Sequence, residues 1–432
     1  MKVDNLVLED QGLAAYRIFN SEEIWRLEME RIFSKAWAYL AHESEIPNPG
    51  DYVLREMANN PVIVVRGDDG KIRAFANLCT HRGILLCRSE AGNAKQLVCP
   101  YHGWTFDTKG QLVATAHRKD FYEGKMDFAQ WGLIAISQVD QWQGFIFGCL
   151  DATSPSLQDY LGDATWYMDL YFNRTPQGME VLGPPQKWVI PMNWKYGAMN
   201  FGADGPHAAK THGPITLLTF QIPQAVIVDA LLKSPAVCLE NGHSTILVQM
   251  PEGGPDYLGL DPELVALYEK KLSPEQQTTL KRILVGVQTN FPNMSWVHSA
   301  VTFSPDEVPV MFLNVRVWQP KGPLETEIWS WYFVEKEASE DWKDKVRKSG
   351  VRTFAAGGTF DQDDAEVWAA SGLSLQSPLL ANRYANFQGI LPYKDRAMTN
   401  FPGPGRVYPS TYSEISEFNV LVGWKKMMGE VQ

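Results

Sequence analysis

The sequence that decides the organisation of this chain reads Cys79-Thr80-His81-Arg82-Gly83 and, further on, Cys99-Pro100-Tyr101-His102-Gly103-Trp104. The pattern is C-x-H, 17 residues, then C-x-x-H, so each half offers one thiolate and one imidazole. Around it, residues 50–149 alternate short apolar runs with the turn signals Gly67-Asp68-Asp69-Gly70 and Lys109-Gly110. Such alternation is typical of β-hairpins. Two Cys-His loops at neighbouring hairpin tips of a small all-β unit would converge on one four-ligand metal site.

Two kinds of metal centre have this ligand composition. A structural zinc ion is commonly bound by two cysteines and two histidines, but such sites usually pair Cys with Cys and His with His along the chain. Here each loop has one of each, which favours a [2Fe–2S] cluster with two cysteines on one iron and two histidines on the other, a Rieske centre. We therefore predict that the cluster is bound by Cys79, His81, Cys99 and His102. Zinc is the alternative.

The amino-acid composition excludes several classes of protein. The 432 residues include 39 basic and 50 acidic ones, a net charge of −11, whereas a nucleic-acid-binding surface shows the opposite imbalance. Five cysteines, an odd number, do not suit a disulfide framework. The longest apolar runs, such as Val62–Val65, fall far short of the roughly 20 residues that span a bilayer. The first residues lack the features of a secretory signal, so we expect a cytoplasmic protein without a nucleic-acid or membrane partner.

The remaining sequence predicts a second, larger domain of mixed type. Predicted helices are 21–37, 158–171, parts of 260–288, 337–354 and 413–428, and predicted strands are 188–194, 215–230, 244–250, 308–318 and 325–333. Strand runs flanked by separate helices indicate an α+β domain with an antiparallel sheet. We expect residues 1–38 to form an N-terminal helical segment that packs on the catalytic domain, 39–155 the Rieske domain, and 156–432 the catalytic domain.

The larger domain contains a second group of candidate metal ligands. His207 and His212 lie five positions apart, which on a regular helix is about 140° of rotation. A π-type bulge would bring them together, and Gly205-Pro206 suits an irregular helix start. Phe360-Asp361-Gln362-Asp363-Asp364 adds three acids, which are either a solvated helix start or a source of a third ligand. Two histidines and one carboxylate form the facial triad of non-haem Fe(II) oxygenases.

Taken together, these residues resemble the large (α) subunit of Rieske-type aromatic-ring-hydroxylating dioxygenases. The resemblance rests on the two Cys-His pairs, the D-x-x-H-x4-H segment at Asp204–His212, Phe291-Pro292-Asn293, Asp363-Asp364, Arg406-Val407, Ser413-Glu414 and a C-terminal helix. It implies a helix-grip (START-like) catalytic domain, with His207, His212 and Asp364 as the iron ligands and Asp363 as the second choice of carboxylate. Catalytic roles are implied for Asp204 and Asn200. The implied substrate pocket consists of Asn200, Phe201, Asn293, Phe354 and Phe360.

The same resemblance implies an activity and a set of partners. Electrons from NADH would reach the protein through a ferredoxin, a reductase or both, since the chain has no G-x-G-x-x-G signature. They would pass through the Rieske centre to Fe(II), where O2 cis-dihydroxylates an aromatic ring, with polycyclic rings among the expected substrates. Asp204 would link the Rieske histidine of a neighbouring subunit to the iron site, within an α3 core or, with a small β subunit, an α3β3 assembly.

Two alternatives stay open at this point: a Rieske monooxygenase or demethylase that acts on an aromatic substrate, and a pure Rieske electron-transfer or zinc-binding protein. Lys210, between the two histidines, could pair with a substrate carboxylate, although a solvated lysine on the helix face is the simpler interpretation.

Overall fold

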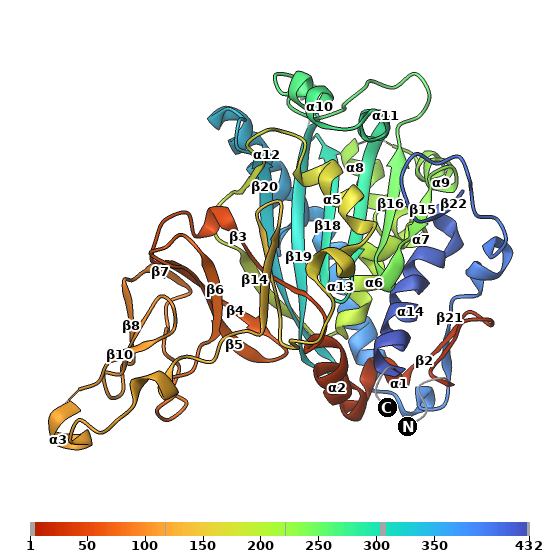
Figure 1. The fold of residues 1–432 in the computed structure, drawn as a ribbon. Helices are drawn as coiled ribbons and strands as arrows, with labels where there is room; N and C mark the ends of the chain where they lie inside the picture. Colours follow the sequence, from red (N-terminus) through yellow and green to blue (C-terminus); the bar gives the residue numbers. More distant parts are fainter. Residues whose placement is uncertain (1–4, 117, 221, 303–307, 430–432) are drawn as a thin grey trace. The chain divides into compact units, whose positions relative to one another are not determined.

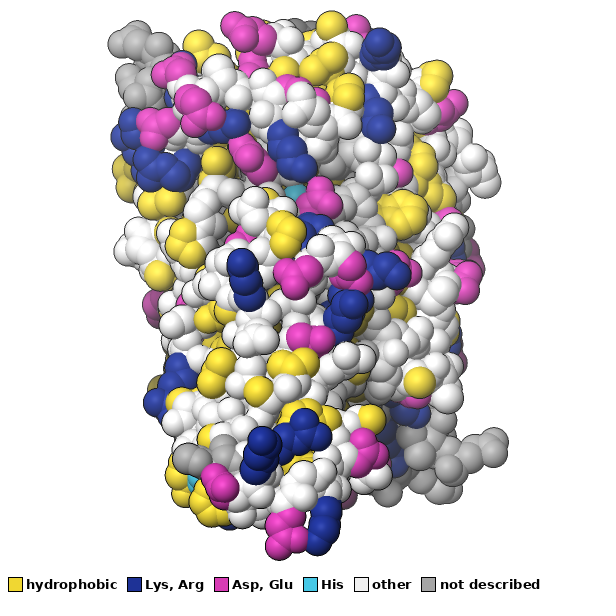
Figure 2. Space-filling model, turned by 60° about the vertical axis from the view of Figure 1, so that its left-hand side comes forward, with side chains coloured by type: hydrophobic (Ala, Val, Ile, Leu, Met, Phe, Trp, Pro, Cys, Tyr) yellow, Lys and Arg dark blue, Asp and Glu magenta, His cyan; other side chains and the backbone are white. Residues whose placement is uncertain are grey.

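The computed structural model describes residues 5–116, 118–220, 222–302 and 308–429, and the chain divides into two compact units. Residues 33–157 form the smaller unit, and residues 1–32 together with 158–432 form the larger one. Figure 1 shows the helices and strands of both units as a ribbon, and Figure 2 shows one face of the molecule, on which acidic and basic side chains are interspersed. The described helices include none that combines the length and the apolar composition of a membrane-spanning segment.

The smaller unit consists mainly of antiparallel β-sheets. Its strands are β3 (Ala38–His42), β4 (Asp51–Met57), β5 (Asn60–Arg66), β6 (Ile72–Ala76), β7 (Ala91–Asn93), β8 (Gln96–Val98), β9 (Thr105–Asp107), β10 (Leu112–Ala114), β11 (Gln138–Trp142) and β12 (Phe145–Cys149). They form three sheets with the orders β6-β5-β4-β7, β10-β9-β8 and β11-β12-β3. The predicted turns connect β5 to β6 and β9 to β10, with Gly70 at φ +75° and Gly110 at φ +79°. A short helix, α3 (Arg118–Tyr122), follows β10.

Strand β5 contributes to two hydrophobic clusters. Its side chains alternate between the faces of the sheet, so Ile63 and Val65 pack in the cluster that contains Cys79 and Cys99. Val62 and Val64, which point the other way, pack with Leu40 and Ile146. All four β5 side chains are fully buried, and each contributes about 1.5–3 kcal/mol of hydrophobic stabilisation. The run Val62–Val65 is therefore the centre of this unit.

The larger unit is built on one nine-stranded antiparallel sheet. The strand order is β13-β20-β19-β18-β17-β16-β15-β22, and β14 also pairs with β20. The strands are β13 (Met179–Val181), β14 (Gln186–Ile190), β15 (Ala236–Cys238), β16 (Ser244–Gln249), β17 (Ile283–Asn290), β18 (Met294–Val301), β19 (Val310–Gly322), β20 (Glu325–Glu335) and β22 (Arg406–Tyr408). A small sheet, β1-β2-β21, is formed by Val7–Leu8, Leu13–Ala15 and Tyr384–Asn386.

Helices surround the large sheet. They are α1 (Arg17–Asn20), α2 (Glu22–Glu28), α5 (Ala164–Phe172), α6 (Trp194–Ala203), α7 (Gly205–Thr211), α8 (Gly213–Phe220), α9 (Gln224–Leu232), α10 (Val265–Lys271), α11 (Pro274–Arg282), α12 (Glu340–Phe354), α13 (Thr359–Ser374) and α14 (Ile415–Gly429). Another short helix, α4 (Leu157–Leu161), lies where the two units meet in sequence. This arrangement confirms the predicted α+β class with an antiparallel sheet and helices.

Both faces of the sheet are covered, as neighbouring residues of β18 show. Trp296 points toward α5, where its ring lies 5.2 Å from that of Phe172. Ser295 points the other way and lies 2.7 Å from the Thr289 hydroxyl, which in turn donates to the Ala198 carbonyl of α6. Helix α6 approaches the sheet closely at Gly197, where a Cβ atom would lie 2.4 Å from the Trp318 ring. The close contact explains why a glycine occupies this helical position.

Some predicted elements need correction. The strands predicted at 308–318 and 325–333 are confirmed as the hairpin β19–β20, and Ser21 caps α2 by accepting a hydrogen bond from the Ile24 amide. The strands predicted within 215–230 are wrong, because this segment forms α8 and α9. Its apolar residues follow no strict alternation, and the prolines Pro214 and Pro223 stand at the two helix starts, where a missing N–H costs nothing.

A buried polar cluster holds the N-terminal segment against α6 and α14. The Glu28 carboxylate accepts hydrogen bonds from Trp194 Nε1 at 2.9 Å and Trp424 Nε1 at 2.6 Å, and it pairs with Lys195 Nζ. Glu28 and Lys195 are both fully buried. Because neither charge is hydrated, removing one of them would leave the other buried and uncompensated. The cluster therefore fixes the start of the helix that leads to the candidate site.

Candidate metal centres

The two Cys-His loops of the smaller unit have the same local design. In each loop the glycine amide donates to the cysteine carbonyl four residues earlier, Gly83 to Cys79 at 2.8 Å and Gly103 to Cys99 at 3.0 Å. Both glycines adopt the left-handed conformation, with φ of +72° and +67°. A side chain would strain this backbone, which explains glycine at the fifth position of both loops. The sequence thus sets the shape of each loop locally.

The four predicted cluster ligands lie together. Cys79 and Cys99 are buried in one hydrophobic cluster, and the rings of His81 and His102 lie 4.7 Å apart. The Nδ1 atoms of both imidazoles are buried and have no hydrogen-bond partner. Burial, with the charges of Arg82 and His102, lowers the pKa of His81, so this imidazole is neutral, the form that binds a metal.

This donor set fits a two-iron cluster better than a single ion. Ligand atoms around one zinc ion would all lie within about 4 Å of one another. Among the described residues, only one group of three or more candidate ligand atoms has all of its members within 4.8 Å of one another. That group is in the larger unit and not at these loops. Two cysteines and two histidines that are wider apart are what a cluster with two iron atoms requires. The orphaned Nδ1 atoms of His81 and His102 would supply its histidine ligands.

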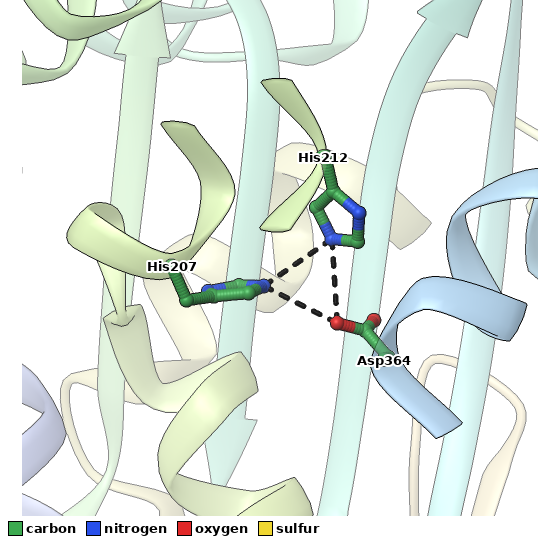
Figure 3. A group of neighbouring side chains, drawn as sticks. All are labelled: His207, His212 and Asp364. Atoms are coloured by element: carbon green, nitrogen blue, oxygen red, sulfur yellow. Dashed lines mark hydrogen bonds and ion pairs between the residues drawn. The ribbon is translucent and has the colours of Figure 1, made fainter. Parts of the chain in front are cut away.

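The second centre consists of His207, His212 and Asp364 (Figure 3). The Nε2 atoms of the two histidines are 3.3 Å apart, and Asp364 Oδ1 lies 3.4 Å from that of His207 and 3.3 Å from that of His212. Three ligands at about 2.1 Å from an ion, at right angles to one another, would be separated by about 3 Å. The three donors therefore need little movement to bind one metal ion on one face.

The route by which the chain brings the two histidines together differs from the predicted π-bulge. Helix α7 ends at Thr211, His212 follows with φ −91° and ψ −6°, and α8 begins at Gly213. Pro214 lacks the amide hydrogen that a continuing helix needs, so the helix breaks and the chain changes direction. His207 is at the start of α7 and His212 at its end, and the break aligns their Nε2 atoms. The π-bulge prediction is wrong.

Oxygen atoms behind each imidazole set its orientation. Asp204 caps α7, since its Oδ1 accepts a hydrogen bond from the His207 amide at 3.1 Å, and its carbonyl oxygen lies 2.6 Å from His207 Nδ1. Asp363 Oδ2 lies 3.5 Å from His212 Nδ1. With the ring proton on Nδ1 in each case, both Nε2 atoms are free to bind a metal. Asp363 therefore lies at the Nδ1 side of the His212 ring, whereas Asp364 lies beside the Nε2 atoms of both histidines.

The electrostatics of the triad favour a cation. Burial alone would lower the pKa of His207, but the charges of Asp204 and Asp364 raise it to about 9. Burial alone would raise the pKa of Asp364, but His212 and His207 hold it well below its usual range. A site that keeps a buried carboxylate ionised and draws a proton to an imidazole at pH 7 stabilises positive charge. This property fits a divalent metal ion.

The five predicted pocket residues divide into separate groups. Asn200 lines a pocket of about 300 Å³ together with Asp204, His207 and Asp364. Phe201, Phe354 and Phe360 do not line this pocket but form a separate aromatic group, in which Phe354 and Phe360 stack at 5.7 Å and Phe360 lies 5.1 Å from the His212 ring. Asn293 donates a hydrogen bond to the Trp318 carbonyl at 3.1 Å, and Lys210 is exposed.

Two residues near the sites escaped the sequence analysis. Trp104 stacks on the His81 ring at 4.7 Å with an interplanar angle of 10°. In the sequence, only the position of Trp104 directly after the second Cys-His motif pointed to this residue. Glu417 lines the same 300 Å³ pocket, and burial with the charges of Asp204 and Glu414 raises its pKa well above the usual value. In the sequence, Glu417 could have been noticed as a lone acid beside Phe418 on the apolar helix α14.

Comparisons with known proteins cover both units. Residues 36–127 match the Rieske [2Fe-2S] domain, and residues 157–402 match the catalytic domain of the ring hydroxylating alpha subunit. The α subunit of N,N-dimethyl phenylurea N-demethylase from Sphingobium sp. (strain YBL2) is 34% identical over 97% of this chain and 92% of its own length. The α subunit of biphenyl dioxygenase from Paraburkholderia xenovorans (strain LB400) is 33% identical over 99% and 93%. The solved structure of naphthalene 1,2-dioxygenase from Rhodococcus sp. bound to indole is similar with a TM-score of 0.92 at 36% identity, and covers 96% of this chain and 94% of that one.

Proposed function

The chain belongs to the family of ring-hydroxylating α subunits, and on that premise we propose that it cis-dihydroxylates an aromatic ring. Members of this family are terminal oxygenases that use O2, an aromatic substrate and electron-transfer partners. The balanced reaction consumes the arene, O2, two electrons and two protons, and gives a cis-dihydrodiol. The electrons derive from NADH and arrive through a ferredoxin, a reductase or both.

One observation carries the proposal. Two imidazole nitrogens and one carboxylate oxygen lie 3.3–3.4 Å from one another. Three protein ligands on one face leave open positions for O2 and leave room for a substrate. His207, His212 and Asp364 would hold Fe(II), and Cys79, His81, Cys99 and His102 would hold the [2Fe–2S] cluster. When bound, these groups supply O2 activation and single electrons respectively.

The surrounding residues have separate tasks in this proposal. Asp204 holds the His207 ring by its carbonyl and caps α7, so that the Nε2 atom keeps its direction. Phe354 and Phe360 form an apolar wall against His212, which would exclude water and accept an aromatic ring by stacking. Asn200 lines the pocket beside Asp204 and would orient the substrate or a water molecule by a hydrogen bond.

A demethylase is the second candidate. The N-demethylase from Sphingobium sp. is as similar to this chain as the dioxygenases are, at 34% identity. The same metal ligands serve both reactions, so the reaction type depends on how the substrate presents its carbon atoms to the site. Monooxygenation places one oxygen atom of O2 in the organic product, and dioxygenation places two.

The test is product analysis with labelled oxygen. The purified oxygenase, supplied with a reductase and ferredoxin, is incubated under ¹⁸O₂ with naphthalene, biphenyl, benzene and N,N-dimethyl phenylurea. Two labelled atoms in a cis-diol support dioxygenation, and one labelled atom or a demethylated product supports the second candidate. Zinc in place of iron and acid-labile sulfide would refute both.

The subunit composition belongs to the same proposal. We expect an α3 core, because Asp204 would connect the iron site of one subunit to a Rieske histidine of the next. A small β subunit would complete an α3β3 assembly. Native mass spectrometry of the protein co-expressed with a candidate β subunit distinguishes α3 from α3β3, and a catalytically active monomer would contradict both.

A further inference from the structure

A buried arginine lies directly behind the metal-binding helix. Arg316, on β19, is completely buried and lies among aromatic rings, with its guanidinium carbon 5.3 Å from the ring centres of both Phe201 and Phe354. A buried cation is costly unless it is fully paired. The described structure gives Arg316 three hydrogen-bonding partners, and each belongs to a different element.

The partners of Arg316 join the sheet to two helices. Nη1 donates to Asp361 Oδ1 at 2.7 Å, and Nη2 donates to the Phe354 carbonyl at 2.8 Å. Nε donates to Asn314 Oδ1 at 2.9 Å, and the amide of Asn314 is fixed by its own bond to Ser330 Oγ at 2.8 Å. Phe354 is the last residue of α12, where carbonyls lack helical partners, and Asp361 is in the first turn of α13. One guanidinium therefore ties the end of α12 and the start of α13 to β19.

This junction carries the third metal ligand. Asp364 lies one turn after Asp361 on the same face of α13, so a rotation or slide of the helix moves both carboxylates together. The Asp361 side chain is 2% exposed, and its Oδ2 atom has no hydrogen-bond partner. Arg316 is thus its only ion-pair partner within the part of the chain that the structure describes. Without Arg316, Asp361 would be a buried, unpaired carboxylate beside Asp364 and His212.

The same junction sets the aromatic wall. Phe354 and Phe360 stand on either side of the α12–α13 connection, and they stack at 5.7 Å with an interplanar angle of 14°. Phe360 in turn contacts the His212 ring at 5.1 Å. The Arg316 guanidinium therefore positions the aromatic wall through its hydrogen bond to Phe354. It positions the metal ligand Asp364 through its pairing with Asp361.

We propose that Arg316, paired with Asp361, is a positioning residue that holds the α12–α13 junction so that the Asp364 carboxylate meets the two histidines. The inference rests on the proposed role of Asp364 as an iron ligand. Arg316 acts through its neighbours, and it does not touch the reacting atoms. Lysine cannot replace it fully, because one ammonium group cannot reach three partners in the fork geometry of a guanidinium.

The experiment measures metal affinity and stability separately. Full-length protein with an intact cluster is stripped of its mononuclear iron, and Co²⁺ is titrated into the wild type, Arg316→Met, Arg316→Lys and the double variant Arg316→Met/Asp361→Leu. The matched control is Arg174→Met, because Arg174 forms a similarly buried pair with Glu335 at 2.6 Å in the same unit. Thermal unfolding by circular dichroism gives stability, and the spectrum of the reduced cluster reports whether the smaller unit is intact.

We expect Arg316→Met to bind Co²⁺ about 10- to 100-fold more weakly than the wild type, as loss of an orienting partner typically does. Arg316→Lys should lie between the two. Arg174→Met should lose stability but bind Co²⁺ as the wild type does. The double variant removes both buried charges and should recover Tm, since an apolar pair in place of a buried ion pair is often neutral or stabilising, while its Co²⁺ affinity stays weak.

Two results would overturn the inference. One is wild-type Co²⁺ affinity in folded Arg316→Met, and the other is recovery of both Tm and affinity in the double variant, which would mean that Arg316 is only structural. Failure of the proposed function looks different, because wild-type protein would then bind no Co²⁺ at the triad. The readout needs no substrate and so does not depend on which aromatic compound is oxidised.

Discussion

Lowering the pH from 7 to 5 should destabilise the larger unit through one buried histidine, His243. This side chain is fully buried beside β16, and its Nδ1 atom accepts a hydrogen bond from the Phe291 amide at 2.9 Å. Nε2 therefore carries the proton and donates to the Tyr160 carbonyl at 3.0 Å. A second proton would have to sit on Nδ1, against the Phe291 N–H. Burial accordingly lowers the pKa of His243 from 6.5 to about 4.

The magnitude follows from these two pKa values. Between pH 6.5 and pH 4 the unfolded chain protonates this histidine and the folded chain does not, so the unfolded state binds more protons and stability falls as the pH falls. For one group the loss is about 1.4 kcal/mol per pH unit. From pH 7 to pH 5 it amounts to about 2 kcal/mol, and most of the effect lies below pH 6.5.

The assay is urea unfolding at pH 7, 6 and 5 for the wild type and His243→Gln, a variant that does not titrate in this range. The helical signal in far-ultraviolet circular dichroism follows the larger unit, to which most of the described helices belong, and visible absorbance of the cluster follows the smaller unit. We expect His243→Gln to be less stable at pH 7 but to lose about 2 kcal/mol less than the wild type between pH 7 and pH 5. Other groups, such as His298, contribute equally to both proteins and cancel in the difference. Parallel pH dependences would show that His243 is not held neutral and would refute the reasoning.

Three further predictions concern the sites and their support. Asp364→Ala should abolish oxygenation and mononuclear iron binding while the EPR signal of the reduced cluster persists; loss of that signal would mean that the residue is mainly structural. Asp204→Asn keeps a good helix cap but removes a charge, so both metals should stay bound while substrate-dependent reoxidation of the reduced cluster slows in stopped-flow absorbance; an unchanged rate would remove the proposed link between subunits. Glu28→Gln leaves Lys195 buried and uncompensated, so the unfolding free energy of the larger unit should fall by about 3–5 kcal/mol, measured with urea; a change below about 1 kcal/mol would show that water or a shifted protonation state relieves the lysine.

The sequence predicted the smaller unit well because its determinants are local. Each Cys-His loop closes within five residues, around a glycine that must adopt positive φ, and its flanking strands are joined by tight turns. The hairpin β19–β20 is local in the same sense. The segment 215–230 was assigned wrongly for a related reason: a short apolar run has no clear period, and only its packing in the larger unit decides between helix and strand.

What the sequence determined by itself is the chemistry of the donors: two Cys-His loops of mixed type, two histidines in one short segment, and a group of three acids far along the chain. The residues themselves left open which acid joins the histidines. The family resemblance favoured Asp364 over Asp363, and the tertiary structure gives the physical reason. Asp361 pairs with Arg316, Asp363 lies behind His212, and Asp364 faces both Nε2 atoms. The spacing of the acids contains no such information, because the rotation of α13 is set by the sheet and by a buried guanidinium on β19. Local motifs fix which atoms are available, and long-range packing fixes where they point.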